Sequence, residues 1–203
     1  MDQITLPQPN IDKSAGLAET LNKRKSHRSF RKDALDLTEI SQILWAGLGL
    51  KQGQDRGRTW PSAGACYPLE LFVCVGPQTV NDLDAGLYLY DATGHTLRLN
   101  RTGDFRSAVA RAALEQSFIG DAPLVIVVAA APVRTTSQYG GERGMRYVYM
   151  DAGHVGQNIY LQATALGLGT VAVGAFRDSQ VLAAAHLPPS LKPLYIMPVG
   201  HPA

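Results

Sequence analysis

The chain has 203 residues, of which 45% are hydrophobic and 18% are charged, and its formal net charge at pH 7 is +2. A chain of this length and hydrophobic content can bury a substantial core, which excludes a disordered protein and predicts a single domain spanning residues 1–203. With so small a net charge, no field of one sign attracts nucleic acid or an anionic membrane surface.

The sequence of the first half of the chain predicts a helix at 15–23, a second helix at 36–49, a loop at 51–58, a strand at 69–75 and a hairpin at 86–100. The second helix has the clearest start, because Asp36 and Glu39 have the spacing of a capping box. It is expected to end near residues 47–49. The two strands of the hairpin are expected at 86–91 and 96–100.

The second half predicts a helix at 104–116, a strand at 123–131, a long helix at 147–166, a strand at 170–175, a short helix at 179–185 and a strand at 194–199. The continuous apolar run at 123–131 is typical of a central strand, and Gly167 is the expected cap of the long helix. Because the hairpin interrupts any regular βαβ rhythm, the pattern favours an α+β fold with a mixed sheet.

Small residues along the long helix would let another helix or a symmetry mate approach closely. They are Ala152, Gly153, Gly156, Ala163 and Ala165.

Cysteine content and the N-terminal sequence bear on the cellular compartment. Cys66 and Cys74 are too few to form a disulfide framework, and no other Cys or paired His offers zinc-binding spacing. The first ten residues lack the basic start and apolar run of a signal peptide, and no stretch approaches the roughly 20 apolar residues of a membrane span. We therefore expect a cytoplasmic protein that binds no nucleic acid, no membrane and no metal.

A basic run follows the first predicted helix and contains Arg24, Lys25, Ser26, Arg28 and Ser29. Such cations can bind a phosphate through charge-assisted hydrogen bonds and can also hydrogen-bond a polar heteroaromatic ring. A solvated basic turn is an equally good interpretation, because short charged runs usually lie on the surface.

Residues 60–68 place small side chains between two prolines, immediately before a strand. This composition lets main-chain groups come close to a flat ligand, although a structural turn explains it equally well. Ser62 does not stand in a Gly-x-Ser-x-Gly elbow, which disfavours hydrolase chemistry. Cys66 is a candidate nucleophile, but an unpaired cysteine is more often a small buried hydrophobic residue.

Gly167, Gly169 and Gly174 superficially resemble a dinucleotide-binding fingerprint. These glycines follow a helix and enter a strand, whereas the fingerprint leaves a strand and enters a helix. Neither a Walker motif nor a His-Glu-x-x-His helix occurs. The sequence therefore disfavours a Rossmann-type site, a nucleoside triphosphatase and a zinc protease.

Three polar residues, Asp151, His154 and Asn158, share one face of the long predicted helix because they are spaced three and four residues apart. A histidine on a mostly apolar helix is more often a structural group than a catalyst. Gln157 and Asn158 are candidates for contact with either a ligand or a partner chain.

Taken in order, these segments resemble the nitroreductase family of flavin enzymes, in particular the SagB-type branch similar to dehydrogenases that oxidise azolines in peptide natural products. The resemblance rests on residues 24–30, 44–46, 61–70, 86–88, 139–147, 153–158, 167–170, 173–176 and 198–202. It implies a mixed, mainly antiparallel sheet flanked by helices, in an intertwined homodimer. It also implies two FMN molecules at the dimer interface, each site being built from both subunits.

The resemblance also implies roles for individual residues. The cofactor-binding residues would be Arg24, Lys25, Ser26, Arg28, Pro61, Ser62, Ala63, Gly64, Val173, Gly174, Gly200 and His201. Residues 24–28 match the motif that holds the FMN phosphate and the polar edge of the isoalloxazine ring, and 200–201 match a segment near the phosphate. Residues 61–64 match the segment that the second subunit lays against the flavin, and 173–174 match the strand over the ring near N5.

Two positions depart from the family pattern. Many nitroreductases have Asn where this chain has Ala65, and the azoline-oxidising branch has a Lys-Tyr pair where this chain has Gln138 and Tyr139. A glutamine cannot accept a proton as a neutral amine does, which leaves Tyr139 as the remaining candidate catalytic residue. We therefore expect an FMN oxidoreductase that uses NAD(P)H to reduce nitroaromatic, quinone or similar flat acceptors. The alternatives are a thiazoline or oxazoline dehydrogenase and a flavin-binding protein without turnover.

Overall fold

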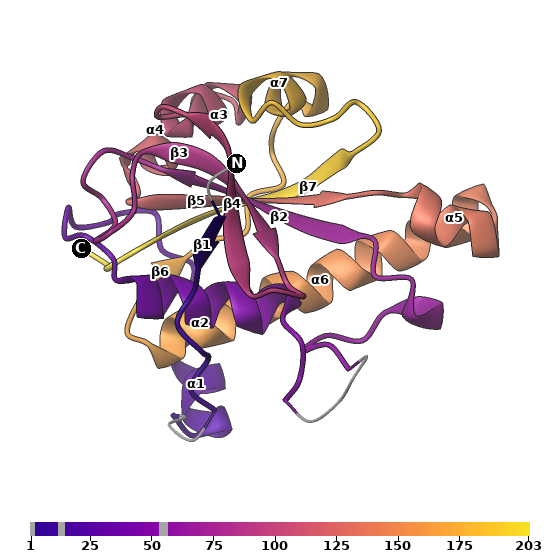
Figure 1. Ribbon diagram of the computed structural model, residues 1–203, viewed down its shortest axis with the longest axis horizontal. Helices are drawn as coiled ribbons and strands as arrows, with labels where there is room; N and C mark the ends of the chain where they lie inside the picture. The colour runs from indigo at the N-terminus through magenta and orange to yellow at the C-terminus, as the bar shows by residue number, and fades with distance from the viewer. Residues whose placement is uncertain (1–2, 12–14, 53–56) are drawn as a thin grey trace.

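The computed structural model describes residues 3–11, 15–52 and 57–203, and a seven-stranded sheet forms its centre (Figure 1). The strands are β1 (Gln3–Thr5), β2 (Leu69–Val75), β3 (Gly86–Asp91), β4 (Thr96–Thr102), β5 (Leu124–Ala130), β6 (Gly169–Thr170) and β7 (Lys192–Gly200). In the order β1-β4-β3-β2-β5-β7-β6, each strand is antiparallel to its neighbours. The expected α+β fold with a mainly antiparallel sheet is confirmed.

Seven helices and one 3₁₀ turn surround the sheet in the described part of the chain. They are α1 (Leu17–Lys23), α2 (Leu37–Leu48), η1 (Ala63–Ala65), α3 (Arg106–Ala112), α4 (Ser117–Asp121), α5 (Val133–Tyr139), α6 (Gly141–Ala165) and α7 (Asp178–Ala184). Helices α2 and α6 cover one face of the sheet, and α3, α4 and α7 cover the other (Figure 1). None of the helices that the structure describes combines the length and apolar character needed to cross a membrane.

The alternation of side chains along the strands divides the core in two. Leu71 and Val73 of β2 pack with α2 and α6, whereas Phe72 and Cys74 of the same strand pack with α3. Strand β5 is buried at every position because both of its faces are covered and β2 and β7 pair with its two edges. It is therefore an interior strand as predicted, although β2 holds the middle place in the order.

Two helix-end predictions are confirmed. The backbone N–H of Asp36 donates to the Glu39 carboxylate at 2.8 Å at the start of α2. Gly167 follows α6 with a φ of +74°, and the next residue, Leu168, donates its N–H back to the Ala163 carbonyl at 2.8 Å.

Several boundaries differ from the prediction. Helix α6 begins at Gly141 rather than at Tyr147, and the helix expected at 104–116 is shorter, because α3 spans only Arg106–Ala112. The elements β1, α4 and α5 were not predicted. The expected strand 170–175 reduces to β6 and a single bridge between Val173 and Ile196. Part of the expected loop, residues 53–56, lies outside the described residues. These differences concentrate at short elements, whose stability comes from tertiary packing rather than from local sequence.

The small residues of α6 divide between its two faces. Ala152, Gly156 and Ala163 are buried within the subunit, and the Gly156 position lies against Tyr195. Gly153 is exposed, with nothing within 4 Å of where a Cβ would stand. Part of the small-residue pattern therefore serves packing on the sheet, and the part that includes Gly153 is open to a neighbour.

Candidate functional site

The residues singled out by sequence gather in two groups. The basic cluster comprises residues 24–28 together with Gly200 and His201. The loop cluster comprises residues 61–67, the side chains of Gln138 and Tyr139, and those of Asp151 and His154.

Backbone pairing positions the basic cluster. After α1, the chain runs beside β6 and the C-terminal segment, and three backbone hydrogen bonds hold it there. The N–H of His27 donates to the Thr170 carbonyl at 2.9 Å, that of Arg31 to the His201 carbonyl at 2.9 Å, and that of Ala203 to the Ser29 carbonyl at 3.2 Å. The structure therefore brings the basic run and the two C-terminal site residues together, although about 170 positions separate them along the chain.

Tyr160 on α6 was not predicted as a site residue, yet it anchors the basic cluster. Its hydroxyl lies 2.9 Å from Ser26 Oγ and accepts a hydrogen bond from the backbone N–H of Ala172 at 2.8 Å. The guanidinium of Arg24 lies 5.2 Å from the centroid of its ring, within the range of a cation–π contact. Nothing in the sequence distinguishes this tyrosine from other partly buried aromatic residues.

Gly169 is explained by close approach to the basic cluster rather than by a dinucleotide fingerprint. A Cβ at this position would stand 2.7 Å from Cγ and 2.8 Å from Cβ of His27. Since β6 and the segment after α1 come this close, only a glycine fits without displacing the backbone.

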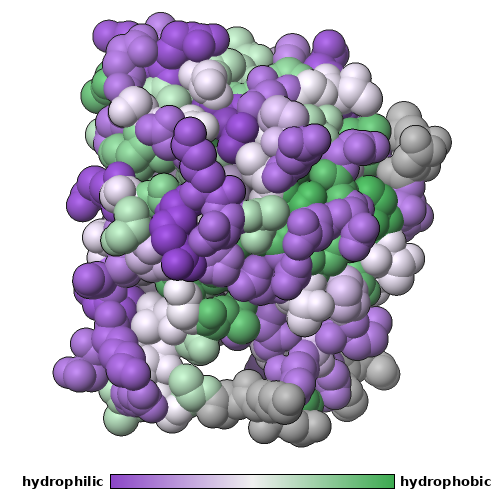
Figure 2. Space-filling model, turned by 90° about the vertical axis from the view of Figure 1, so that its left-hand side faces the viewer, coloured by the Kyte–Doolittle hydropathy of each residue, from purple (hydrophilic) through white to green (hydrophobic). Residues whose placement is uncertain are grey.

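The cations of the basic cluster lack anionic partners among the described residues. Arg24, Lys25 and Arg28 take part in none of the ion pairs there, whereas the neighbouring Lys23 and Arg31 pair with carboxylates. Burial and, secondarily, the charge of Lys25 lower the pKa of His27. Hydrophilic residues cover most of the face on the side of α1 and the C-terminus, with a large hydrophobic patch and smaller ones among them (Figure 2). An anion docked at these cations would gain charge-assisted hydrogen bonds that the chain itself does not supply.

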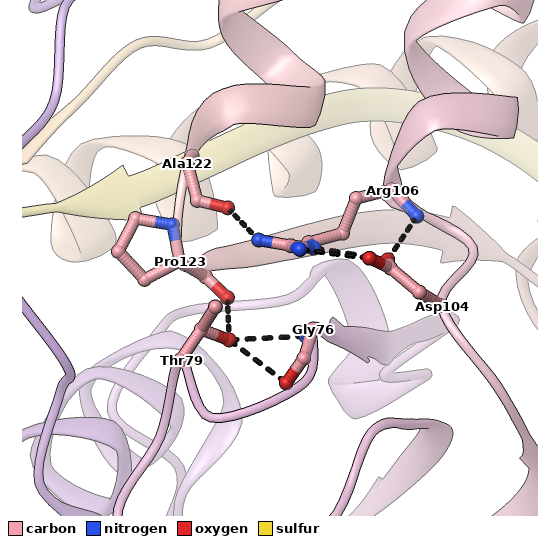
Figure 3. A network of polar contacts seen from close by, with 6 residues as sticks. All are labelled: Gly76, Thr79, Asp104, Arg106, Ala122 and Pro123. Atoms are coloured by element: carbon pink, nitrogen blue, oxygen red, sulfur yellow. Dashed lines mark hydrogen bonds and ion pairs between the residues drawn. The ribbon is translucent and has the colours of Figure 1, made fainter. Parts of the chain in front are cut away.

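A polar network of Gly76, Thr79, Asp104, Arg106, Ala122 and Pro123 (Figure 3) lies next to the C-terminal segment, since Pro123 packs against Gly200. Arg106 forms an ion pair with Asp104 at 2.7 Å and donates to the Ala122 carbonyl at 2.7 Å. Burial alone would raise the pKa of Asp104, but the hydrogen bonds and charge of Arg106 outweigh burial and lower it. Next in the chain, Pro123 has its ring 2.6 Å from where a Cβ of Gly200 would stand. The network therefore fixes the surface on which the C-terminal segment lies.

Side chains from α6 hold the loop cluster on one side. The Asp151 carboxylate accepts hydrogen bonds from Ser62 Oγ at 2.7 Å and from the backbone N–H of Ala63. His154 Nδ1 lies 3.3 Å from the Pro61 carbonyl. Asn158, the third residue predicted for this face, donates to the carbonyls of Thr59 at 3.1 Å and Ala46 at 3.0 Å. The prediction that Asp151, His154 and Asn158 share one helix face is confirmed. This face binds the segment from Thr59 to Ala63. Asn158 therefore has a structural role within the subunit.

Helix α5 holds the loop cluster on the other side. Gly64 has a φ of +58°, and a Cβ there would stand 2.4 Å from the Tyr139 hydroxyl. Cys66 Sγ donates to Gln138 Oε1 at 3.1 Å. Cys66 is only half-buried, so the expectation of a small buried hydrophobic residue is wrong for it. Cys74 is buried, and burial raises its pKa to about 12.

In the part of the chain that the structure describes, Val173 and Gly174 form no hydrogen bond with the residues of either cluster. Val173 is buried and exchanges backbone hydrogen bonds of 2.9 and 3.0 Å with Ile196 of β7. Gly174 is exposed, and a Cβ there would meet nothing within 4 Å. The main chain at Gly174 is therefore open to a flat ligand.

The two clusters contact different stretches of α6. Asp151 in the loop cluster and Tyr160, which contacts the basic cluster, are nine residues apart, which corresponds to about 14 Å along a helix axis. In Figure 1, α1 and the C-terminus lie on the left, and α5, against which the loop cluster packs, lies on the far right. One chain therefore does not close the two clusters around a common ligand.

A cavity of about 490 Å³ lies between α1, α2 and α6. Its lining includes Leu17, Trp45, Asn158 and Leu161, and Leu17 is 67% exposed. Among the described residues, no group of three or more His, Cys, Asp or Glu could hold a metal ion.

Comparison with known proteins gives one consistent result. Residues 21–201 match the family model described as "Nitroreductase family". A Methanocaldococcus jannaschii protein named "Putative nitroreductase" is 42% identical over 200 residues, covering 98% of this chain and 97% of that protein. A crystal structure of a Ralstonia eutropha protein, also titled a "putative nitroreductase", has a TM-score of 0.86 at 32% identity, covering 99% of this chain and 90% of that one.

A further structural neighbour is the Escherichia coli microcin synthetase McbBCD complex, solved with truncated pro-MccB17 bound. It has a TM-score of 0.76 at 23% identity, covering 98% of this chain and 78% of that chain. At this level of identity the likeness shows the fold alone.

Proposed function

The chain belongs to the nitroreductase family and is an oxidoreductase, and from this premise we propose that it binds FMN and uses NAD(P)H to reduce nitroaromatic, quinone or similar flat acceptors. We also propose that it acts as a homodimer in which each FMN lies between the basic cluster of one subunit and the loop cluster of the other.

The observation that carries the proposal is the set of unpaired cations in the basic cluster. Arg24, Lys25 and Arg28 lie at a segment fixed by backbone pairing, and they lack carboxylate partners among the described residues. A phosphate is the kind of group that such cations bind. The residues present therefore fit the phosphate and polar ring edge of FMN.

The separation of the two clusters supports the dimer. Residues 61–64 and the basic cluster contact stretches of α6 about 14 Å apart within one chain, so a second copy has to bring them around one flat ligand. The exposed Gly153 and the exposed apolar residues Tyr149 and Met150 leave the outer face of α6 open for that contact.

When bound, FMN supplies the hydride chemistry. Lys25 and Arg28 would hold the polar edge of the ring, where their charge favours the negative charge that develops on reduction. Residues 61–64 would exclude water from the opposite part of the ring. The exposed main chain at Gly174 would let the flavin ring approach closely. In this mechanism Tyr139 borders the acceptor site, and solvent supplies the protons.

Stopped-flow mixing of the yellow protein with NADH and with NADPH tests this proposal. Rapid bleaching, followed by reoxidation with a nitroaromatic or a quinone, is the expected result. Bound FMN that neither donor bleaches would point instead to a flavin-binding protein without turnover. Light scattering that finds an FMN-loaded monomer at micromolar concentration would contradict the shared site, since an interface of the obligate class buries more than about 2,000 Å².

Azoline oxidation is the second candidate function, and the likeness of fold to a microcin synthetase complex together with the place of Tyr139 favours it. Tyr139 would then act as the acid–base group, with Gln138 in the position of the Lys. Oxidation of a thiazoline peptide by the unmodified protein, with no reduction by NAD(P)H, would support this function over the first.

A further inference from the structure

We infer that Asp151 is a positioning residue: its ionised carboxylate holds residues 61–67 in the one shape that can pack against a cofactor bound by the partner subunit. The inference rests on the proposed function. It assigns a role to a residue that touches neither the ligand nor the reacting atoms.

The geometry around Asp151 supports this role. Asp151 as a whole residue is 2% exposed, and its carboxylate accepts two hydrogen bonds, both from the segment that would lie against the flavin. One donor is Ser62 Oγ at 2.7 Å, and the other is the backbone N–H of Ala63. Ser62 Oγ in turn accepts the N–H of Tyr67 at 3.1 Å. A single side chain thus ties together the start and the end of the turn.

The negative charge of Asp151 does not itself stabilise the fold. Burial of a carboxylate costs free energy unless its hydrogen bonds compensate for the loss of water. Burial raises the pKa of Asp151, and the opposing contributions of Ser62, His154 and Ala63 do not cancel that effect. The ionised form is therefore kept at a cost in stability, which is typical of functional rather than structural positions.

The loop has other supports, so a change at Asp151 alters its shape without unfolding the protein. The Pro61 carbonyl faces His154 on the same helix, and Cys66 and Gly64 contact Gln138 and Tyr139 on α5. The titratable and charged groups that face Asp151 or its loop include His154 on α6, Tyr139 on α5, and Cys66 and Tyr67 in the loop. Two cations contact Tyr67 as well: the Arg58 guanidinium lies 5.0 Å from its ring centroid, and Arg134 donates to its carbonyl at 3.4 Å. Within the described chain, no Lys or Arg forms an ion pair with Asp151.

Asp151→Asn tests the inference because it keeps the volume and removes the charge. The amide can accept from Ser62 or from Ala63, but its NH₂ group then faces the second donor. We expect the Kd for FMN, measured by fluorescence titration at pH 8, to rise about tenfold relative to wild type. Asp178→Asn, which alters an exposed carboxylate on α7, is the matched control and should leave the Kd unchanged.

Two further readouts separate positioning from ordinary structural support. The melting temperature of FMN-free Asp151→Asn should stay within about 4 °C of wild type, because the variant also removes a buried charge. The ratio of the two Kd values should shrink as the pH is lowered through the raised pKa of Asp151, because protonation makes the wild-type side chain neutral as well. The free energy of unfolding should change in the opposite direction. Since the pKa of Asp151 is raised in the folded state, its protonation at lower pH stabilises the fold, while it weakens the hydrogen bonds that hold the loop.

Hydrogen exchange of the FMN-free protein distinguishes failure of this inference from failure of the proposed function. Faster exchange at the amides of Ala63 and Tyr67 in Asp151→Asn, with β2 unchanged, supports the positioning role. If the wild type binds no FMN, the proposed function is wrong, and the exchange data alone decide whether Asp151 holds the loop. An FMN Kd for Asp151→Asn equal to that of wild type at pH 8, or unchanged exchange, would overturn the inference.

If Asp151→Asn does not fold, Ser62→Ala removes the same hydrogen bond without touching α6 and should raise the Kd similarly.

Discussion

The basic cluster and the loop cluster are built in opposite ways. Main-chain hydrogen bonds with Thr170, His201 and Ala203 hold the segment that carries the basic cluster, and its cationic side chains are left without carboxylate partners among the described residues. Side chains hold the loop cluster, chiefly Asp151. Substitution in the basic cluster should therefore change ligand binding without changing shape, whereas substitution in the loop cluster should change shape first.

The largest effect is expected at Gly64. An alanine there has to adopt a φ near +58° and places its Cβ 2.4 Å from the Tyr139 hydroxyl. Left-handed backbone and overpacking together should destabilise the loop by about 2 to 4 kcal/mol, measured by thermal unfolding and by hydrogen exchange at residues 62–67.

Two variants control for the Gly64 substitution. Gly174→Ala adds a methyl group in open space and should leave the melting temperature unchanged. Adding Tyr139→Phe to Gly64→Ala should recover part of the lost stability, since it removes the nearest atom. Equal melting temperatures for Gly64→Ala and Gly174→Ala would contradict the side-chain control of the loop.

Arg24→Ala should separate binding from shape in the basic cluster. Losing a charge-assisted phosphate contact of about 1.5 to 3 kcal/mol should weaken FMN binding roughly tenfold to a hundredfold. The melting temperature of the FMN-free protein should change little, because the backbone pairing remains. Arg31→Ala is the control, since Arg31 already pairs with Asp33. Unchanged FMN affinity in a fluorescence titration of Arg24→Ala would identify the cluster as a solvated basic turn.

A smaller effect is expected when the Tyr139 hydroxyl alone is removed. If the flavin carries the chemistry, Tyr139→Phe should change nitro or quinone reduction by only a few-fold, whereas loss of a general acid or base costs about 10² to 10⁴ in rate. Gln138→Lys sharpens the comparison, because it restores the pair of the azoline-oxidising branch. Thiazoline oxidation gained by that variant and absent from the parent is the expected outcome. Efficient thiazoline oxidation by the parent would contradict the reductase assignment.

The smallest effect is expected outside both clusters, where side chains hold the N-terminal segment. His95 Nε2 lies 2.9 Å from the Pro7 carbonyl and 2.7 Å from Ser41 Oγ, and Nδ1 lies 2.8 Å from the Tyr90 hydroxyl. Burial lowers the pKa of His95 despite the opposing effect of its hydrogen bond to Pro7.

The folded state therefore favours neutral His95. The stabilisation is present above the unfolded pKa of about 6.5 and is lost as the pH falls through the lowered folded pKa. The melting temperature should fall more between pH 8 and pH 5 in wild type than in His95→Asn. An identical fall in both proteins would assign the pH dependence to other groups.

Prediction from sequence succeeded where one local signal dominated. Strands β2 and β3 have the predicted bounds because most of their residues are apolar or aromatic, which favours strands. Helix α5 escaped prediction because Val133–Tyr139 is short and largely polar. Its stability comes from a close crossing with α6, where a Cβ at Gly144 would stand 2.7 Å from the Thr136 backbone.

The sequence by itself determined the α+β class, the basic run and the family, because local patterns of hydrophobicity, charge and glycine carry that information. Only the tertiary structure decided which side chains support the site. Asp151 meets Ser62 across 89 residues, and Tyr160 meets Ser26 across 134. Such contacts depend on the path of the whole chain around the sheet, and no local preference of either residue encodes them. For the same reason, the basic run could be predicted from six consecutive residues, whereas the control of the loop by Asp151 became visible only in the fold.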